Sequence, residues 1–157
     1  MIGVGYDGSP EAQAALEAAA DLARQLGASL RLVAVAPAPD SAGVPPWPPL
    51  MDARQLGRRL RHDLEGRIDA ALATLPADLG ATGSVVSGAP ASVLLDKAGL
   101  GFDLLALGSR GYGTLRRVLL GSVSSDLVSA APCPVVVFPR SVVVELADGE
   151  PAGRTAA

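Results

Sequence analysis

Cysteine, histidine and lysine occur only once each in this sequence of 157 residues, as Cys133, His62 and Lys97. A single cysteine excludes an intramolecular disulfide bond and any zinc site built from cysteines. A single histidine excludes a zinc site with two or three histidine ligands. A metal ion such as Mg²⁺ is therefore expected only where carboxylates or the phosphates of a ligand hold it.

Several catalytic signatures are also missing. The sequence contains no phosphate loop of the type G-x4-G-K-S/T, no G-x-S-x-G, no H-E-x-x-H and no C-x-x-C. A Ser-His-Asp triad would have to use His62, which falls in a predicted surface helix. The sequence thus offers no familiar hydrolase or metalloprotease site.

Aromatic residues make up only 3% of the chain, so the core must be built from valine, leucine and alanine. Hydrophobic residues make up 49% of the chain, which excludes a chain that is disordered as a whole. The net charge is −3, and nothing in the sequence indicates the basic patch that a nucleic-acid-binding protein normally carries. The sequence contains no run of 18 apolar residues, so it predicts no membrane-spanning helix. The N-terminal residues lack the basic region of a signal peptide. We expect a cytoplasmic protein.

The spacing of apolar residues predicts strands that alternate with helices. Ser9 followed by Pro10 is typical of a helix start, and Gly27 of a helix end. Alternation of this kind forms βαβ units, which give a parallel sheet with right-handed crossovers. We expect strands at 2–6, 29–36, 82–87, 104–107 and 134–139, and helices at 10–26, 52–75, 90–100 and 122–131.

Three segments stand apart from this alternation. The proline-rich segment 37–50, which contains Trp47, is predicted to be a loop, and Trp47 either covers a ligand or packs on the surface. Residues 140–157 form a polar tail that contains the apolar stretch 142–146, a candidate edge strand. The arginines of helix 52–75 alternate with acidic residues, which predicts a solvated face with i,i+4 ion pairs.

Two glycine patterns are candidates for a phosphate site. The run Gly3 to Gly8 matches G-x-G-x-x-G, but a dinucleotide fingerprint must follow a strand, and here the glycines lie inside one. An NAD-linked oxidoreductase is therefore a remote alternative. The second pattern, G-x2-G-x9-G-S/T from Gly108 to Ser122, is roughly ten times rarer by chance in this composition.

The position of the second pattern favours a ligand site. It starts at the carboxyl end of strand 104–107 and ends where helix 122–131 begins. Ligands of open α/β sheets bind at such an edge, where glycine amides and a helix N-terminus attract phosphate. The alternative is that Gly108 and Gly111 only turn the chain and that Ser122 only caps the helix.

The stretch from Leu107 to Ser124, with Ala131–Val137 and the opening Gly5-Tyr-Asp-Gly-Ser9, resembles the universal stress protein family. The resemblance covers residues 1 to about 139 and includes the element specific to the ATP-binding branch. It implies an α/β fold with one five-stranded parallel sheet in the order 3-2-1-4-5 and helices on both faces, the Rossmann-like fold of the adenine nucleotide alpha-hydrolases. Residues 1–140 would form this domain and 141–157 an extension.

The resemblance also implies a nucleotide site and a homodimer. Asp7, with Gly5 beside it, would lie near the ribose or phosphates, although an aspartate after a strand also commonly makes an Asx turn. Val35 would contact adenine through its backbone. The residues that would hold ribose and phosphates are Gly108, Ser109, Arg110, Gly111, Gly121, Ser122, Val123 and Ser124.

The function implied is an ATP-binding stress-response or regulatory module, with Mg²⁺ held through the phosphates and with a downstream partner that the sequence does not identify. The alternative is a slow ATPase or a phosphoryl or adenylyl transferase. Fast phosphoryl transfer needs a cationic clamp and a positioned base. The predicted site offers Asp7 as its one plausible acid and neither lysine nor histidine, which favours binding over efficient catalysis.

Overall fold

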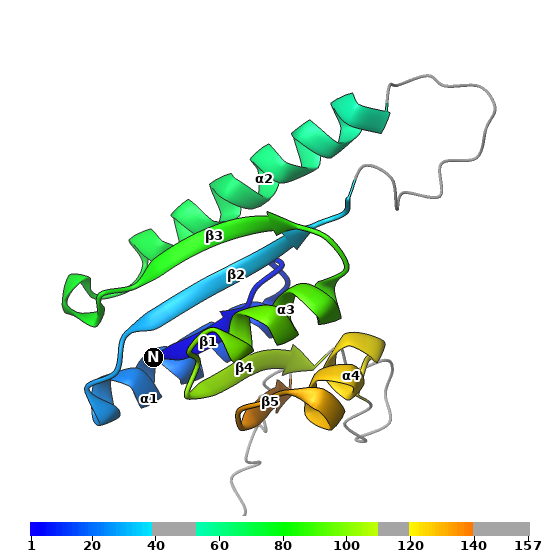
Figure 1. The fold of residues 1–157 in the computed structure, drawn as a ribbon. Helices are drawn as coiled ribbons and strands as arrows, with labels where there is room; N and C mark the ends of the chain where they lie inside the picture. The colour runs from blue at the N-terminus through cyan, green and yellow to red at the C-terminus, as the bar shows by residue number, and fades with distance from the viewer. Residues whose placement is uncertain (39–52, 110–119, 140–157) are drawn as a thin grey trace, which may run out of the picture.

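Five parallel strands form the central sheet in the order β3-β2-β1-β4-β5 (Figure 1). The computed structural model describes residues 1–38, 53–109 and 120–139. The predicted strand order, parallel sheet and alternation with helices are confirmed. The elements are β1 (Ile2–Gly5), α1 (Pro10–Leu26), β2 (Leu30–Ala36), α2 (Ala53–Ala73), the short 3-10 helix η1 (Ala77–Leu79), β3 (Thr82–Ser87), α3 (Pro90–Gly99), β4 (Leu104–Ser109), α4 (Ser122–Ala130) and β5 (Val135–Pro139).

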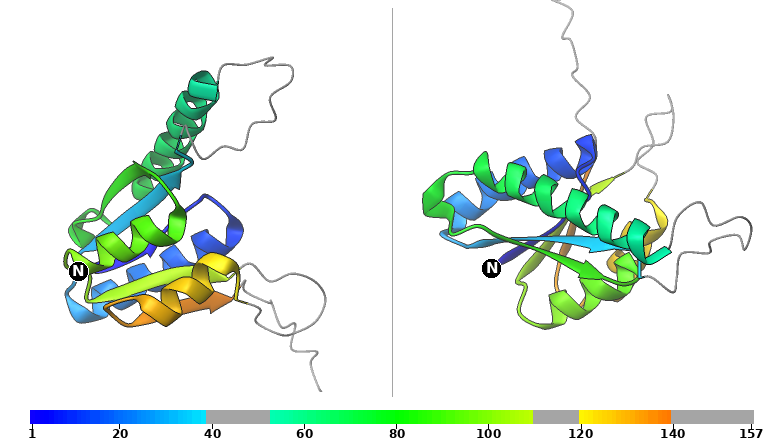
Figure 2. Two further views of the ribbon diagram at one scale, coloured as in Figure 1. Left: turned by 45° about the vertical axis from the view of Figure 1, so that its right-hand side comes forward. Right: turned by 90° about the horizontal axis from the view of Figure 1, so that it is seen from above.

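Two helices cover each face of the sheet. Seen from above, α1 and α2 lie on one side of the strands and α3 and α4 on the other (Figure 2). The alternation of side chains along β2 divides the core accordingly, because Leu32 and Ala34 pack on the α1/α2 side whereas Val33 packs on the α3/α4 side. Among the described helices, none is both long enough and apolar enough to cross a bilayer.

The ends of α1 follow the predicted capping residues. The Ser9 hydroxyl oxygen accepts a hydrogen bond from the Ala12 amide at 3.1 Å, and Pro10 opens the first turn. Gly27 ends the helix in the left-handed conformation, with φ of 61°. These caps fix where the chain leaves β1 and where it enters β2.

Gly3 and Gly5, two glycines of the first pattern, lie in β1 and leave room for side chains that pack on this strand. A Cβ atom at Gly3 would overlap the ring of Phe102, and one at Gly5 would lie 2.7 Å from a Leu107 methyl and 3.2 Å from a Leu94 methyl. Both positions face the α3/α4 layer, so the missing side chains let large residues approach the central strand.

The end of β4 differs from the prediction. The strand continues through Gly108 and Ser109, which pair with Phe138 and Pro139 of β5, so the expected glycine loop does not start at residue 108. Pairing with β5 outweighs the weak strand propensity of glycine. Trp47 and the apolar stretch 142–146 lie outside the described residues.

Candidate functional site

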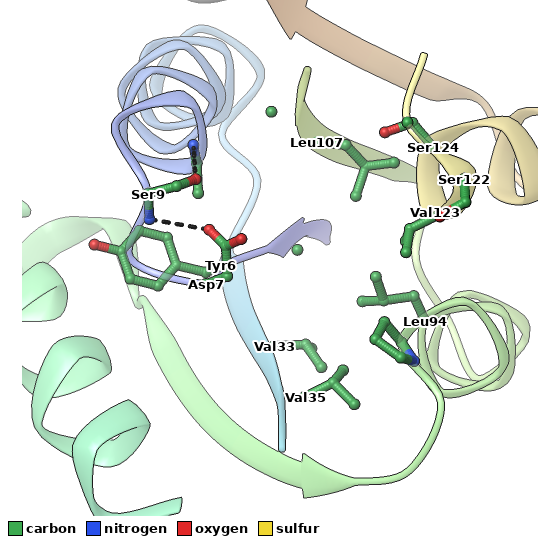
Figure 3. Close-up of a pocket in the computed structure, with 15 residues that line it drawn as sticks. Tyr6, Asp7, Ser9, Val33, Val35, Leu94, Leu107, Ser122, Val123 and Ser124 are labelled. Atoms are coloured by element: carbon green, nitrogen blue, oxygen red, sulfur yellow. Dashed lines mark hydrogen bonds between the residues drawn. The ribbon is translucent and has the colours of Figure 1, made fainter. Parts of the chain in front are cut away.

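A cavity of about 480 Å³ opens at the carboxyl ends of β1 and β4 (Figure 3). It lies where the strand order reverses, since the chain leaves β1 towards β2 and leaves β4 towards β5 on the opposite side. Its lining residues are Gly5, Tyr6, Asp7, Ser9, Ala12, Val33, Val35, Pro90, Leu94, Leu107, Gly108, Gly121, Ser122, Val123 and Ser124. The cavity thus contains most of the residues that the sequence singled out.

The turn between β1 and α1 forms one polar wall. The Asp7 carboxylate accepts a hydrogen bond from the Ser9 amide at 2.9 Å, which is the Asx turn considered above as an alternative role. Asp7 nevertheless lines the cavity, so the turn places its carboxyl group there rather than removing it. Asp7 is the one carboxylate among the described lining residues.

The first turn of α4 forms the opposite wall. Gly121 is the N-cap, with φ of −67° and ψ of 168°, and it has no side chain to cap the helix. The first intrahelical bond runs from the Ser125 amide to the Gly121 carbonyl at 2.9 Å. The amides of Ser122, Val123 and Ser124 are therefore the unbonded donors that every helix start presents, and an anion is a favourable partner for them. Ser122 begins the helix but does not cap it.

Gly108 lies between the cavity and α1. A Cβ atom there would overlap the backbone of Glu11, so glycine is needed because α1 approaches β4 closely, not because the chain turns. Ser109 is 1% exposed and is not among the lining residues. Arg110 and Gly111 lie outside the described residues.

An apolar wall completes the cavity, and sequence reasoning missed most of it. Val33 and Val35 project from β2, Leu94 from α3 and Leu107 from β4 (Figure 3). Val33 and Val35 share one face of β2 because side chains alternate along a strand, which is a signal that the sequence carried. The contribution of Leu94 had no such signal, because it depends on how α3 packs over β1.

Tyr6 is the other titratable side chain in the described lining. Burial raises the pKa of its phenol, the Arg67 guanidinium opposes this rise, and Asp7 adds to it. The hydroxyl group donates to the Gln13 side-chain oxygen at 3.1 Å. The described residues contain no group of three or more histidine, cysteine or acidic side chains that would hold a metal ion.

Comparison with protein-family models matches residues 1–139 to the universal stress protein family. The chain belongs to this family. It is 36% identical over 135 residues to a universal stress protein of Thermus aquaticus, covering 84% of this chain and 93% of that one. It is 34% identical over 143 residues to one of Mycobacterium tuberculosis, covering 86% of this chain but only 46% of that longer protein.

Solved structures of universal stress proteins share the fold. UspA of Lactobacillus plantarum is 26% identical, with a TM-score of 0.65 over 87% of this chain and 95% of that one. A universal stress protein in complex with cAMP has a TM-score of 0.56 at 23% identity, over 89% and 96% of the two chains. A family protein of Arabidopsis thaliana with AMP bound has a TM-score of 0.61 at 20% identity, over 90% and 92%.

Proposed function

We propose that the cavity binds an adenine nucleotide, ATP in the first place, and that the protein is a nucleotide-dependent stress-response or regulatory module. One observation carries this proposal. An uncapped helix start, with the Ser122 and Ser124 side chains on it, faces the Asp7 turn across a cavity whose remaining wall is apolar. Phosphate is the ligand class that suits the helix start, and a flat base suits the apolar wall.

The register of the sheet supports a place for the base. β1 ends at Gly5, which pairs with Val33, whereas β2 continues to Ala36. The Tyr6 amide donates to the Val33 carbonyl at 2.9 Å. Val35 directs its main-chain groups to the same side as Val33, because backbone direction repeats every two residues of a strand. These groups lie beyond the end of β1, where they are available to an adenine edge.

The complexes of the family members with cAMP and with AMP support an adenine nucleotide as the ligand class. We further propose ATP rather than a monophosphate, because the stretch from Gly111 to Ser122, whose glycines resemble the element of the family's ATP-binding branch, follows β4 and leads into α4. Mg²⁺ would bind through the phosphates, since Asp7 is the one carboxylate of the described lining.

Binding suits the described cavity better than rapid catalysis. Its described lining contains no lysine, arginine or histidine, and efficient phosphoryl transfer depends on a cationic clamp and a positioned base. A slow ATPase or a phosphoryl or adenylyl transferase is the second candidate, favoured by the carboxylate of Asp7 within the cavity.

The purified protein tests the proposal directly. Denaturation should release an adenine nucleotide that chromatography identifies, and protein freed of ligand should bind added ATP in a calorimetric titration. Ser124→Ala should weaken ATP binding severalfold, whereas Ser125→Ala, one residue along the same helix and outside the cavity, should not. Absence of both released nucleotide and measurable ATP binding would refute the proposal, and turnover of added ATP would favour the second candidate.

A further inference from the structure

Arg67 of α2 contacts the turn that follows β1. Its Nη1 atom donates to the Asp7 carbonyl oxygen at 3.4 Å, while Nη2 pairs with Asp63 of its own helix at 3.2 Å. Gly8 has φ of 78°, and a Cβ atom there would lie 2.7 Å from the Arg67 Cδ atom. The stem of Arg67 therefore packs on the backbone of this turn, and its charged end hydrogen bonds to it.

The turn that Arg67 contacts carries two polar residues of the cavity. The Asp7 carboxylate accepts from the Ser9 amide at 2.9 Å, and the Ser9 hydroxyl accepts from the Ala12 amide at 3.1 Å. These bonds join the turn to the first turn of α1, so a shift of the Asp7 backbone moves Asp7, Ser9 and the helix start together. Arg67 itself does not line the cavity, so any effect it has on a ligand passes through the turn.

The charge of Arg67 also acts within the turn. Burial raises the pKa of Tyr6, and the Arg67 guanidinium works against this rise by stabilising the phenolate. The same guanidinium hydrogen bonds to the Asp7 carbonyl, and its positive charge there offsets part of the repulsion between the Asp7 carboxylate and an anionic ligand.

We propose that Arg67 is a positioning residue of the nucleotide site, which holds the Asp7–Ser9 turn in place and makes α2 responsive to whether the site is occupied. This inference rests on the proposed function. Because energetic coupling is reciprocal, a contact that favours ligand binding through the turn is itself favoured when the ligand is bound. Nucleotide should therefore stabilise the attachment of α2 to the turn.

Arg61 provides a matched control on the same helix. It pairs with Glu65 at 3.0 Å, as Arg67 pairs with Asp63, and its Nη2 donates to the Val85 carbonyl of β3 at 3.1 Å. Its Nη1 also donates to the Ser87 hydroxyl at 3.5 Å. The two side chains are about equally exposed, at 47% and 52%. Neither Val85 nor Ser87 lines the cavity, so Arg61→Ala removes an ion pair and a bond to a backbone carbonyl, together with the Ser87 bond, without disturbing the turn.

Calorimetric titration with ATP should separate the two arginines. Arg67→Ala should weaken binding by about three- to tenfold, the effect of one hydrogen bond, and Arg61→Ala by less than about twofold. Arg67→Lys keeps the charge and should recover part of the loss. Hydrogen exchange should report that ATP protects the amides of residues 63–71 in the wild type and in Arg61→Ala, but not in Arg67→Ala.

A second measurement needs no nucleotide. In a Tyr112→Phe background Tyr6 is the remaining tyrosine, since the chain has two. Arg67→Ala should then raise the pKa of Tyr6 in an absorbance titration, and Arg61→Ala should leave this pKa unchanged. The two alanine variants should unfold at similar urea concentrations. An unchanged Tyr6 titration, or equal ATP affinity of the two alanine variants, would overturn the inference while leaving the proposed function intact. Failure of the wild type to bind ATP would overturn both.

Discussion

The backbone of Ala12 lies against Gly108, where a Cβ atom would stand only 2.7 Å from the Ala12 amide nitrogen. Neither backbone can yield cheaply, because one belongs to the capped start of α1 and the other to a strand between two neighbours. Gly108→Ala should therefore lower the free energy of unfolding by about 1–3 kcal/mol. Gly121→Ala is the control, because a Cβ atom there meets nothing within 4 Å, and it should cost less than about 1 kcal/mol. Equal losses in urea titrations would contradict this interpretation.

Gly121 should matter for ligand binding instead. Gly121→Val places a branched side chain beside the unbonded amides at the start of α4, where it should block the close approach of a phosphate. We expect ATP binding to fall at least about tenfold with the fold retained, because the backbone at Gly121 is extended and suits valine. Wild-type affinity in a folded Gly121→Val protein would count against the phosphate position.

Nucleotide selectivity tests the place of the base. If main-chain groups of Val35 contact the base, ATP should bind more tightly than GTP, because the donor and acceptor pattern of guanine is reversed at that edge. Val35→Ala should change ATP affinity less than Gly121→Val does, since the proposed contacts are made by the backbone. Competition titrations with both nucleotides measure this selectivity. Equal affinities for ATP and GTP would contradict the proposed position of the base at the end of β2.

Tyr6 predicts a loss of stability at alkaline pH. Burial raises the pKa of its phenol in the folded protein above 10.0, the ordinary value for the unfolded chain. The folded state therefore holds its proton more tightly, and this contribution is complete below pH 10 and is lost as the pH rises through the folded value. Urea unfolding between pH 8 and 11 should give a smaller decline for Tyr6→Phe than for the wild type, and identical slopes would refute the assignment.

The edge strand β5 predicts a homodimer. Within the described sheet β5 pairs with β4 alone, and an apolar edge with free backbone groups invites pairing with a second copy about a two-fold axis. We expect sedimentation at micromolar concentration to give a dimer, and a monomer would contradict the proposal. Truncation after Arg140 then tests which segment forms the dimer contact. If the dimer is unchanged, the contact is made by β5, and if the dimer is lost, it is made by the extension 141–157.

Local signals in the sequence predicted the elements closely. The helix expected at 10–26 and the strand at 82–87 agree with α1 and β3 residue for residue, because caps and alternation are properties of neighbours in sequence. The strand at 104–107 was too short, because Gly108 and Ser109 become strand only by pairing with β5.

Contacts between segments that are far apart in the sequence could not be predicted from such local signals. The i,i+4 pairs of Arg61 and Arg67 were expected, and both occur. Their second bonds, to backbone carbonyls of other elements, depend on how α2 lies across the sheet and have no local trace. The same holds for Leu94, which the packing of α3 alone places in the cavity.

The central position of β1 has a consequence for biosynthesis. Ile2 pairs with Leu30 on one side and with Leu104 on the other, so β1 gains its second neighbour in the sheet only after about a hundred further residues have been synthesised. Pairings of such long range are entropically costly and slow to form. The cavity requires both neighbours as well as α4, so it is completed only after most of the chain has been translated. A bound nucleotide would then mark those molecules in which folding has gone to completion.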